Sequence, residues 1–264
     1  MEFTPIQTAI IHPGDDLTTA ILEGLKDKEI ELKDQDILLI ASKIVSVAEG
    51  RIVELKDVRP SATATALAKQ IDLDERQVEL ILQNADVVYG KVRKALLTLK
   101  DNFLIANAGI DKSNSPDGQV ILWSINPQEK AEKIRTDILK QTGKHVGIVI
   151  VDSRTTPLRH GTSGVALAVA GFKPVKDYRQ KKDLFGNSLQ ITLQNLADDL
   201  ASGAHVLMGE ADERTPVVLA RNVPVEFTSE IDHSMAFIAA DNCLYMKALK
   251  DGSHGRNKKH YHHL

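Results

Sequence analysis

The stretch Val146-Gly-Ile-Val-Ile-Val-Asp152 is a short run of mostly β-branched residues that ends on a carboxylate. Such a run predicts a buried strand, with the acid at the point where the chain leaves the sheet. Two further apolar runs end in the same way, at Asp111 and at Glu210. Any one of these acids is better explained as a cap of a turn or helix. Three together, each followed by small or hydroxyl residues, favour a site that holds a divalent metal against a phosphate-bearing substrate.

Strand and helix signals alternate on both sides of this stretch, without an internal repeat. Hairpins mixed with intervening helices predict an α/β protein of the α+β type with mixed sheets, rather than one doubly wound sheet. Neither glycine-rich signature of the common nucleotide-binding folds is present. The predicted strands are residues 3–11, 36–41, 51–55, 95–99, 103–106, 119–123, 146–152, 164–171, 205–210 and 215–220, and the predicted helices start at Asp15 or Asp16, Pro60-Ser61, about Asp74, Asn126-Pro127 and Leu189.

The composition limits the kind of protein that these 264 residues can form. A formal net charge of -3 argues against a general binder of nucleic acid or of anionic membranes, which would carry a basic surplus. No apolar stretch is long enough to cross a bilayer, and the N-terminus lacks the pattern of a signal peptide. We therefore expect a cytoplasmic protein that acts on small molecules.

Two segments carry the strongest signals of a site. In the segment 107–114, Asp111 offers a hard oxygen and Asn114 an amide, although an Asx-type turn explains the pattern equally well. In the segment 151–161, Asp152 and Ser153 offer oxygens for a metal ion. Arg154 and Arg159 are fork-shaped donors suited to phosphate or carboxylate groups.

Two other segments carry weaker signals. In the segment 208–216, Glu210 is the expected metal ligand, while solvated turn charges are the default interpretation of Asp212 and Glu213. In the segment 41–51, Lys43 is placed just after a strand, where it suits a phosphate contact. A helix cap at Ser42 with a surface lysine is nearly as plausible.

These four segments, in this order, resemble the coenzyme F420-0:γ-glutamyl ligase family. By this resemblance, GTP and two divalent ions (Mg²⁺ or Mn²⁺, with K⁺ as a further candidate) activate a terminal carboxylate of a deazaflavin coenzyme precursor as an acyl phosphate. The amine of L-glutamate then attacks, which forms an amide and releases GDP and phosphate. The resemblance runs from about residue 8 to 221 and rests on Pro13-Gly-Asp-Asp16, Ser42-Lys-Ile-Val-Ser46, Ala48-Glu-Gly50, Asn107-Ala-Gly-Ile-Asp111, Ser113-Asn114, the stretch 165–171 and Met208-Gly209.

The resemblance implies a role for each matching residue. Asp111 and Asp152 would hold one metal ion, and Ser153 and Glu210 the second. Asp152 and Arg159 would be the catalytic residues. The residues expected at the nucleotide are Ser42, Lys43, Asn114, Met208, Gly209, Glu210, Ala211, Asp212, Glu213, Arg214 and Thr215.

The resemblance also implies an intertwined homodimer with two domains in each chain. We expect residues 1–73 and 163–248 to form a larger nucleotide and metal domain, and residues 74–162 a smaller inserted one. Residues 249–264 would be a disordered polar tail, and metal binding by its histidines is the weaker alternative. The small residues of the predicted strand 164–171 invite the close approach of another sheet or a ligand.

The chain departs from the family pattern at several places, of which Ser153 in place of threonine and Glu210 in place of a frequent glutamine each keep an oxygen ligand. Thr8-Ala9 replaces the usual Leu-Pro, and Val47 replaces a common lysine, so the identity of the nucleotide stays open. After Asp152, the residues Arg154, Thr155, Thr156 and Leu158 are unlike the family pattern and leave the acceptor acid open. The number of added glutamates is open as well. The rival hypotheses are an amide ligase for another cofactor-like acid and a non-catalytic nucleotide or cofactor sensor. The three retained carboxylates count against the sensor.

Overall fold

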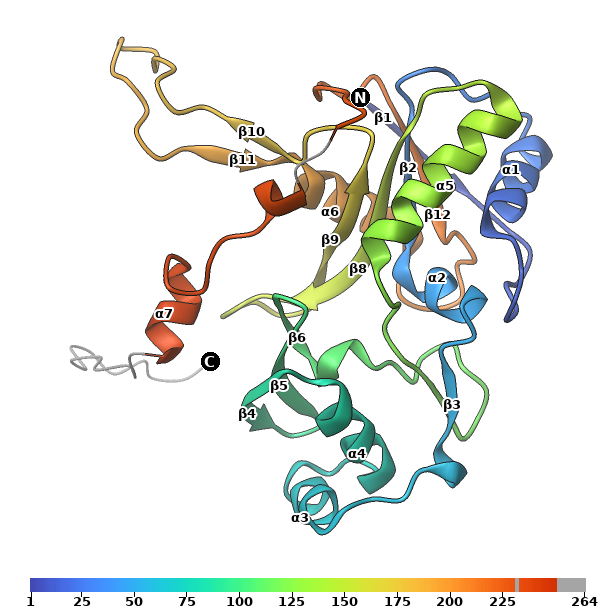
Figure 1. The fold of residues 1–264 in the computed structure, drawn as a ribbon, viewed down its shortest axis with the longest axis vertical. Helices are drawn as coiled ribbons and strands as arrows, with labels where there is room; N and C mark the ends of the chain where they lie inside the picture. Colours follow the sequence, from blue (N-terminus) through green and yellow to red (C-terminus); the bar gives the residue numbers. More distant parts are fainter. Residues whose placement is uncertain (231–232, 251–264) are drawn as a thin grey trace.

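A mixed five-stranded sheet forms the centre of the larger part of the molecule (Figure 1). The computed structural model describes residues 1–230 and 233–250. The strands lie in the order β1–β12–β2–β8–β9, and of these neighbours only β2 and β8 run parallel. Their bounds are β1 Glu2–Ile6, β2 Ile37–Ala41, β8 Gly147–Thr155, β9 Thr162–Ala170 and β12 Val217–Arg221.

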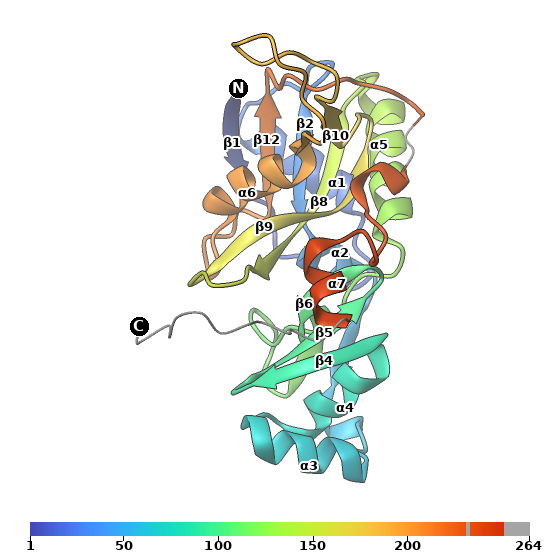
Figure 2. The same ribbon diagram turned by 90° about the vertical axis from the view of Figure 1, so that its left-hand side faces the viewer.

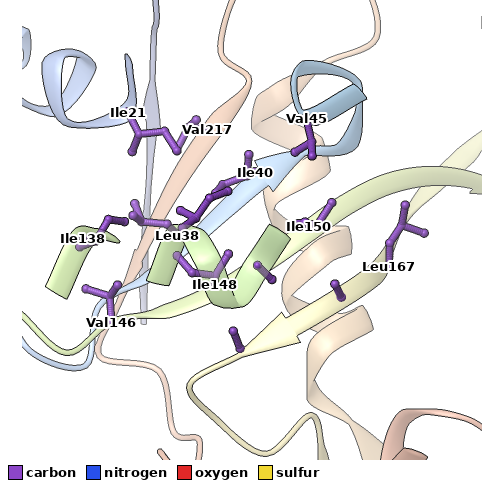
Figure 3. Close-up of a cluster of buried hydrophobic side chains, with 14 of the residues drawn as sticks. Ile21, Leu38, Ile40, Val45, Ile138, Val146, Ile148, Ile150, Leu167 and Val217 are labelled. Carbon is purple, nitrogen blue, oxygen red and sulfur yellow. The ribbon is translucent and has the colours of Figure 1, made fainter. Parts of the chain in front are cut away.

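Helices cover both faces of this sheet, which explains why its central strands are apolar without interruption. Leu38 and Ile40 of β2 face α1 and α5, and Figure 3 shows this cluster with Ile21 and Ile138 from those helices. Ile37 and Leu39 point to the other face, where α6 packs. These four residues of β2 are fully buried. The covering helices are α1 Leu17–Asp27, α5 Pro127–Thr142 and α6 Leu196–Met208.

A smaller group of elements lies beyond one end of the sheet (Figure 2). Its core contains buried residues from Leu55 to Leu122, among them Ile71 and Ile81. The strands pair as β3–β7 and as β4–β5–β6. The elements of this group are β3 Ile52–Glu54, η1 Leu55–Asp57, α3 Ala62–Ile71, α4 Glu75–Asn84, β4 Val87–Val92, β5 Ala95–Lys100, β6 Phe103–Ala106, η2 Asn107–Gly109 and β7 Gln119–Ile121.

The predicted division at 74–162 does not follow the sheets. Residues 127–155 contain α5 and β8, and β8 pairs with β2 and β9 in the large sheet. Their apolar side chains also pack into the core of that sheet. The division of the chain into domains itself stays a prediction, and most of the predicted tail 249–264 lies outside the described residues.

Most predicted elements are present, and the predicted α+β class with mixed sheets is confirmed. The side chain of Asp16 caps α1 by accepting a hydrogen bond from the backbone N–H of Thr19 (2.7 Å), as expected of that residue type. Helix α5 begins with Pro127 and ends at Gly143, which has a φ of 70°. The segment 95–106 forms the predicted hairpin β5–β6. Strand β4 was not predicted.

Two predictions between residues 189 and 210 are wrong. The helix begins at Leu196 and not near Leu189, because the side chain of Asn195 caps it and Leu193–Asn195 pair with Val175–Asp177 as strands β11 and β10. The helix then continues to Met208, so the apolar run that ends at Glu210 is helical. Periodicity alone does not separate a short apolar strand from a buried helical segment.

The small residues of β9 serve contacts within the same chain. A side chain at Gly164 would place its Cβ 2.2 Å from the backbone oxygen of Ala201 in α6, so only glycine fits there. Helix α6 therefore makes the close approach that the sequence led us to expect from another sheet or a ligand.

The remaining described helices are short. They are α2 Ser42–Ala48, η3 His233–Ala236 and α7 Leu244–Lys250. Among the described residues, no helix is long and apolar enough to cross a bilayer.

Candidate active site

A cavity of about 420 Å³ opens where β2 ends and β8 leaves the body of the sheet. Its walls come from five separate stretches of the chain, at residues 8–11, 41–47, 111–114, 151–153 and 205–216. Every predicted metal, nucleotide or catalytic residue lines this cavity except Arg159 and Glu213. The fold therefore brings together predicted residues that are up to about 170 positions apart, and their roles stay predictions.

The parallel pair β2–β8 brings the first two groups together. Ala41 and Val151 are partners in the register, so Ser42 and Asp152 follow side by side at the same edge of the sheet. The backbone N–H of Ser153 donates to a carboxylate oxygen of Asp152 (2.7 Å). Burial raises the pKa of Asp152 to about 6, against smaller opposing effects of Ser153, Ser42 and Lys43. The carboxylate of Asp152 is therefore costly to ionise while no cation is bound beside it.

The loop after β6 delivers the second carboxylate. Gly109 has a φ of 70°, and a Cβ there would lie 2.8 Å from the Trp123 ring, so the tight turn requires glycine. Asp111 then pairs with the ammonium of Lys43 (2.6 Å) and accepts hydrogen bonds from the backbone and hydroxyl of Ser113. Burial opposes ionisation of Asp111, but Lys43 and Ser113 outweigh it, and the pKa of Asp111 lies below its usual value.

The loop that follows α6 closes the cavity from the opposite side. The hydroxyl of Thr215 donates to the backbone oxygen of Leu207 (2.8 Å), which fixes the two ends of the loop to each other. The carboxylate of Glu213 accepts from the backbone N–H of Ala211 (2.9 Å). Glu213 therefore supports the loop rather than lining the cavity. The amide of Asn114 donates to the backbone oxygen of Ala211 (2.9 Å), so the two predicted binding loops touch.

Glu210 is held by two side chains that the sequence did not single out for this role. Its Oε1 accepts a hydrogen bond from the hydroxyl of Thr162 and lies 2.9 Å from Nε2 of His205. Both contacts use the same oxygen, which leaves Oε2 as the oxygen suited to a ligand. His205 lies inside the apolar run that ends at Glu210, so no separate signal marked it.

Arg159 lies outside the cavity. It belongs to the exposed turn between β8 and β9, where its backbone N–H donates to the oxygen of Thr156 (3.3 Å). Arg154 instead forms an ion pair with Asp198 of α6 (3.1 Å). The departures at Thr8, Ala9 and Val47 all line the cavity.

Comparison with known proteins is decisive for the family. Residues 5–222 match the family model described as F420-0:Gamma-glutamyl ligase. The chain belongs to this family. It is 38% identical over 217 residues to a protein of Methanopyrus kandleri named coenzyme F420:L-glutamate ligase, with 82% of this chain and 84% of that protein covered.

Two other members of the F420-0:Gamma-glutamyl ligase family carry the same name. The protein of Methanocaldococcus jannaschii is 42% identical, with 74% of this chain and 79% of its own length covered. The protein of Archaeoglobus fulgidus is 34% identical, with 85% and 89% covered. The matches in both proteins and in the family model extend over most of the sequence in which the site residues lie.

The donor set suits a metal ion that is shared with a nucleotide. Among the described residues, no three His, Cys, Asp or Glu side chains form a cluster that could hold a metal by themselves. Asp111 and Asp152 nevertheless lie close enough for the charge of one to raise the pKa of the other. The ammonium of Lys43 forms an ion pair with Asp111, and its positive charge also lowers the pKa of Asp152. Mg²⁺ at nucleotide sites commonly uses one or two carboxylates and completes its shell with phosphate oxygens and water.

Proposed function

We propose that the protein joins L-glutamate to coenzyme F420-0 through a γ-glutamyl amide, with GTP as the activating nucleotide. The convergence of the predicted residues on one cavity, from segments that the sequence keeps far apart, is the observation that carries this proposal. The names of the relatives supply the substrates, coenzyme F420 and L-glutamate. The cavity supplies the carboxylates, the lysine and the polar loops that phosphoryl transfer requires.

The reaction has two balanced steps. A carboxylate oxygen of the acceptor attacks the terminal phosphorus of GTP, the bond to the bridging oxygen breaks, and GDP leaves. The nitrogen of L-glutamate then attacks the acyl carbon, inorganic phosphate leaves with the bonding electrons, and the nitrogen gives up a proton. Neither step needs a protein nucleophile, so the residues act by position and charge.

The residues of the cavity divide this work among them. Two divalent ions, Mg²⁺ or Mn²⁺, would neutralise the phosphate charge when bound, and K⁺ is a further candidate. Asp111 and Asp152 would hold one ion, and Ser153 and Glu210 the other. Lys43 offers a positive charge to the phosphates. The loop 208–215, tied to Asn114, would enclose the nucleotide.

The rival acceptor remains a second candidate because of the residues beside the reacting site. Arg154 follows Asp152 by two positions and departs from the family pattern. An amide ligase of the same family for another cofactor-like acid would differ at such a place. A nucleotide or cofactor sensor would have no need of the carboxylate pair Asp111 and Asp152.

The product decides between these candidates. The protein is incubated with F420-0, L-glutamate, Mn²⁺ and GTP, and the acceptor is analysed by mass spectrometry. We expect the acceptor to gain one or more glutamyl residues, with one GDP formed for each. ATP replaces GTP in a parallel reaction to define the nucleotide. GDP formation with a different acid, and none with F420-0, would select the rival acceptor.

We also propose that the active unit is a homodimer. The strands β10 and β11 and the connecting residues 178–192 form an arm that extends away from the body of the molecule (Figure 1). Leu184 and Phe185 in this arm are 99% and 90% exposed, and Ile191 is 87% exposed. Apolar side chains on a projecting arm are typical of a contact with another chain.

Light scattering tests the dimer directly. The protein at micromolar concentration should show about twice the 29.0 kDa chain mass. The double substitution Leu184→Ser and Phe185→Ser should lower this mass toward that of one chain. A monomeric wild-type protein with full activity would contradict the proposed dimer and leave the ligase chemistry untouched.

A further inference from the structure

A second cavity of about 280 Å³ lies along β9, on the outer edge of the large sheet. It is bounded by β6, by β9, by the start of α6 and by residues 236–238. No residue lines both this cavity and the one that holds the predicted site. Nothing in the proposed roles of GTP, metal or glutamate makes use of it.

One wall of the second cavity is aromatic and apolar. The rings of Phe103 and Phe237 meet edge to face, with their centroids 5.3 Å apart. Ile238 and the side chains of β9 extend this surface. A wall of this kind suits a flat aromatic ligand, because rings pack well in offset and edge contacts.

The guanidinium of Arg154 lines the same cavity and makes only part of the hydrogen bonds that it can donate. One terminal nitrogen of Arg154, Nη2, donates to Asp198 (3.1 Å). The Nε of Arg154 is buried and has no hydrogen-bond partner among the described residues. The Arg154 side chain as a whole is 39% exposed and lines the cavity, so an acceptor oxygen of a ligand could pair with its guanidinium. The second cavity therefore favours an anionic oxygen beside its aromatic wall.

The exposed edge of β9 is already occupied by side chains. Asp198 accepts the backbone N–H of Ala166 (2.9 Å). The amide of Gln128 donates to the backbone oxygen of Val169 (2.8 Å) and accepts from the backbone N–H of the same residue (3.2 Å). These contacts replace those of a neighbouring strand, so a small ligand fits this cavity better than an added strand does.

The second cavity extends close to Asp152 of the candidate active site. Val165, which lines it, is the direct partner of Asp152 in the pairing of β8 with β9. Partners in an antiparallel pair point to the same face of the sheet, about 5 Å apart at their Cβ atoms. Arg154 lies two positions along the same strand. A ligand with its ring against the edge-to-face pair of Phe103 and Phe237 could therefore extend an acidic end toward Asp152.

We propose that this second cavity binds the acceptor, with the fused aromatic ring of the acceptor against Phe103 and Phe237 and its terminal carboxylate at Arg154. The inference rests on the proposed function, because only the ligation supplies an aromatic acid as acceptor. It assigns Arg154, and not Arg159, to the recognition of that acid. It also explains why a departure from the family pattern at Arg154 would change the acceptor rather than the phosphate chemistry.

Equilibrium dialysis of the acceptor against the full chain, without GTP, tests this assignment. Arg154→Met keeps most of the aliphatic stem and removes the charge, and it should weaken acceptor binding at least about tenfold, as expected for the loss of a hydrogen bond to a charged group. Phe237→Ala should weaken it through the loss of the aromatic wall. Arg93→Met, on an exposed arginine that pairs with Asp72, is the matched control and should leave binding unchanged.

Steady-state kinetics separates recognition from a merely structural effect. Arg154→Met should raise KM for the acceptor and leave KM for GTP within about twofold of the wild type. Unchanged acceptor affinity in both Arg154→Met and Phe237→Ala, in a wild-type enzyme that forms the amide, would overturn the assignment and leave the proposed function standing. If the acceptor binds in a way that depends on Arg154 but no amide forms, the assignment of the cavity would stand and the proposed function would be overturned.

Discussion

Strand β8, just beyond its buried part, and the loop after η2 each bring one carboxylate to the same cavity, and the pKa values of the two carboxylates are shifted in opposite directions. Asp152 directly follows the buried residues 147–151 of β8, and its burial raises its pKa to about 6. Asp111 lies in the loop after η2, and its partners Lys43 and Ser113 hold its pKa below the usual value. Ionisation of Asp152 in β8 is therefore unfavourable, whereas the charge of Asp111 in the loop is stabilised by its neighbours.

This difference leads us to expect different responses of the two residues to a bound cation. A carboxylate that its surroundings do not stabilise gains most when a cation arrives. A carboxylate that already holds an ammonium must exchange it for the incoming ion. The two positions should respond differently to the same substitution.

The largest expected effect is the loss of turnover in Asp152→Asn. The substitution keeps the size of the side chain and removes the charge at the strand end. The rate of GDP formation should fall at least about 10²-fold, comparable to the loss of one preorganised electrostatic contact, while the far-UV circular dichroism spectrum stays that of the wild type. A variant with nearly the wild-type rate would remove Asp152 from the mechanism.

The metal-free stabilities of Asp152→Asn and Asp111→Asn should change in opposite directions. Because the folded state raises the pKa of Asp152 from about 3.8 to about 6, ionised Asp152 destabilises the wild type above pH 6, by up to about 3 kcal/mol at about 1.4 kcal/mol per tenfold change in proton affinity. Asp152→Asn should therefore be the more stable protein at pH 7.5 in the presence of a chelator. The gain should shrink as the pH falls through 6 and vanish below about 4.

Asp111→Asn should lose stability under the same conditions. Its carboxylate has a lowered pKa, so it contributes stability above its unfolded pKa, and this contribution is lost as the pH falls through the folded value. Urea unfolding from pH 4 to 8 measures both variants. Equal losses of stability at pH 7.5 would show that the pKa values of the two carboxylates are not shifted in opposite directions.

Lys43→Met sharpens the comparison at the loop. The ammonium of Lys43 competes with a divalent ion for Asp111, so its removal should tighten Mn²⁺ binding about three- to tenfold when no nucleotide is present. The affinity for GTP should fall, because a phosphate contact is lost. Calorimetric titration with Mn²⁺ alone and with GTP measures both effects. Lys112→Met, on the exposed neighbour of Asp111, is the control, and weaker Mn²⁺ binding in Lys43→Met would contradict the competition.

The smallest expected effect concerns the loop after α6. His205 and Thr162 hold one oxygen of Glu210, and outer groups of this kind orient metal ligands. His205→Leu should weaken the affinity for Mn²⁺ measured with GTP by several-fold to about tenfold. His205→Gln, which retains a nitrogen donor near the position of Nε2, should restore most of it. Equal losses in both variants would assign His205 to packing alone.

The sequence predicted the strand ends better than the loops, for physical reasons. The run Val146–Val151 is rich in β-branched residues, which favour a buried strand over a helix, and such a strand fixes where Asp152 emerges. The segment 189–210 carries apolar spacing that fits more than one element, and the start of α6 depends on the pairing of β10 with β11, which no local signal announces.

The site shows the same division. The convergence of Ser42, Asp111, Asp152 and Glu210 followed from recognisable motifs, and the structure brings them to one cavity. The contacts of His205 and Thr162 with Glu210 depend on the packing of α6 against β9. The position of the Arg154 guanidinium, with its buried Nε, depends on the ion pair with Asp198. Such contacts between distant segments have no signature in the sequence.

The release of GDP by the wild type, measured with and without F420-0 and with and without L-glutamate, tests the central claim most directly. We predict that sustained release requires F420-0 and is fastest with both substrates, and that Asp152→Asn is inactive in all four mixtures. Release that ignores F420-0, or that persists in Asp152→Asn, would contradict the account of this cavity as the active site of a glutamate ligase.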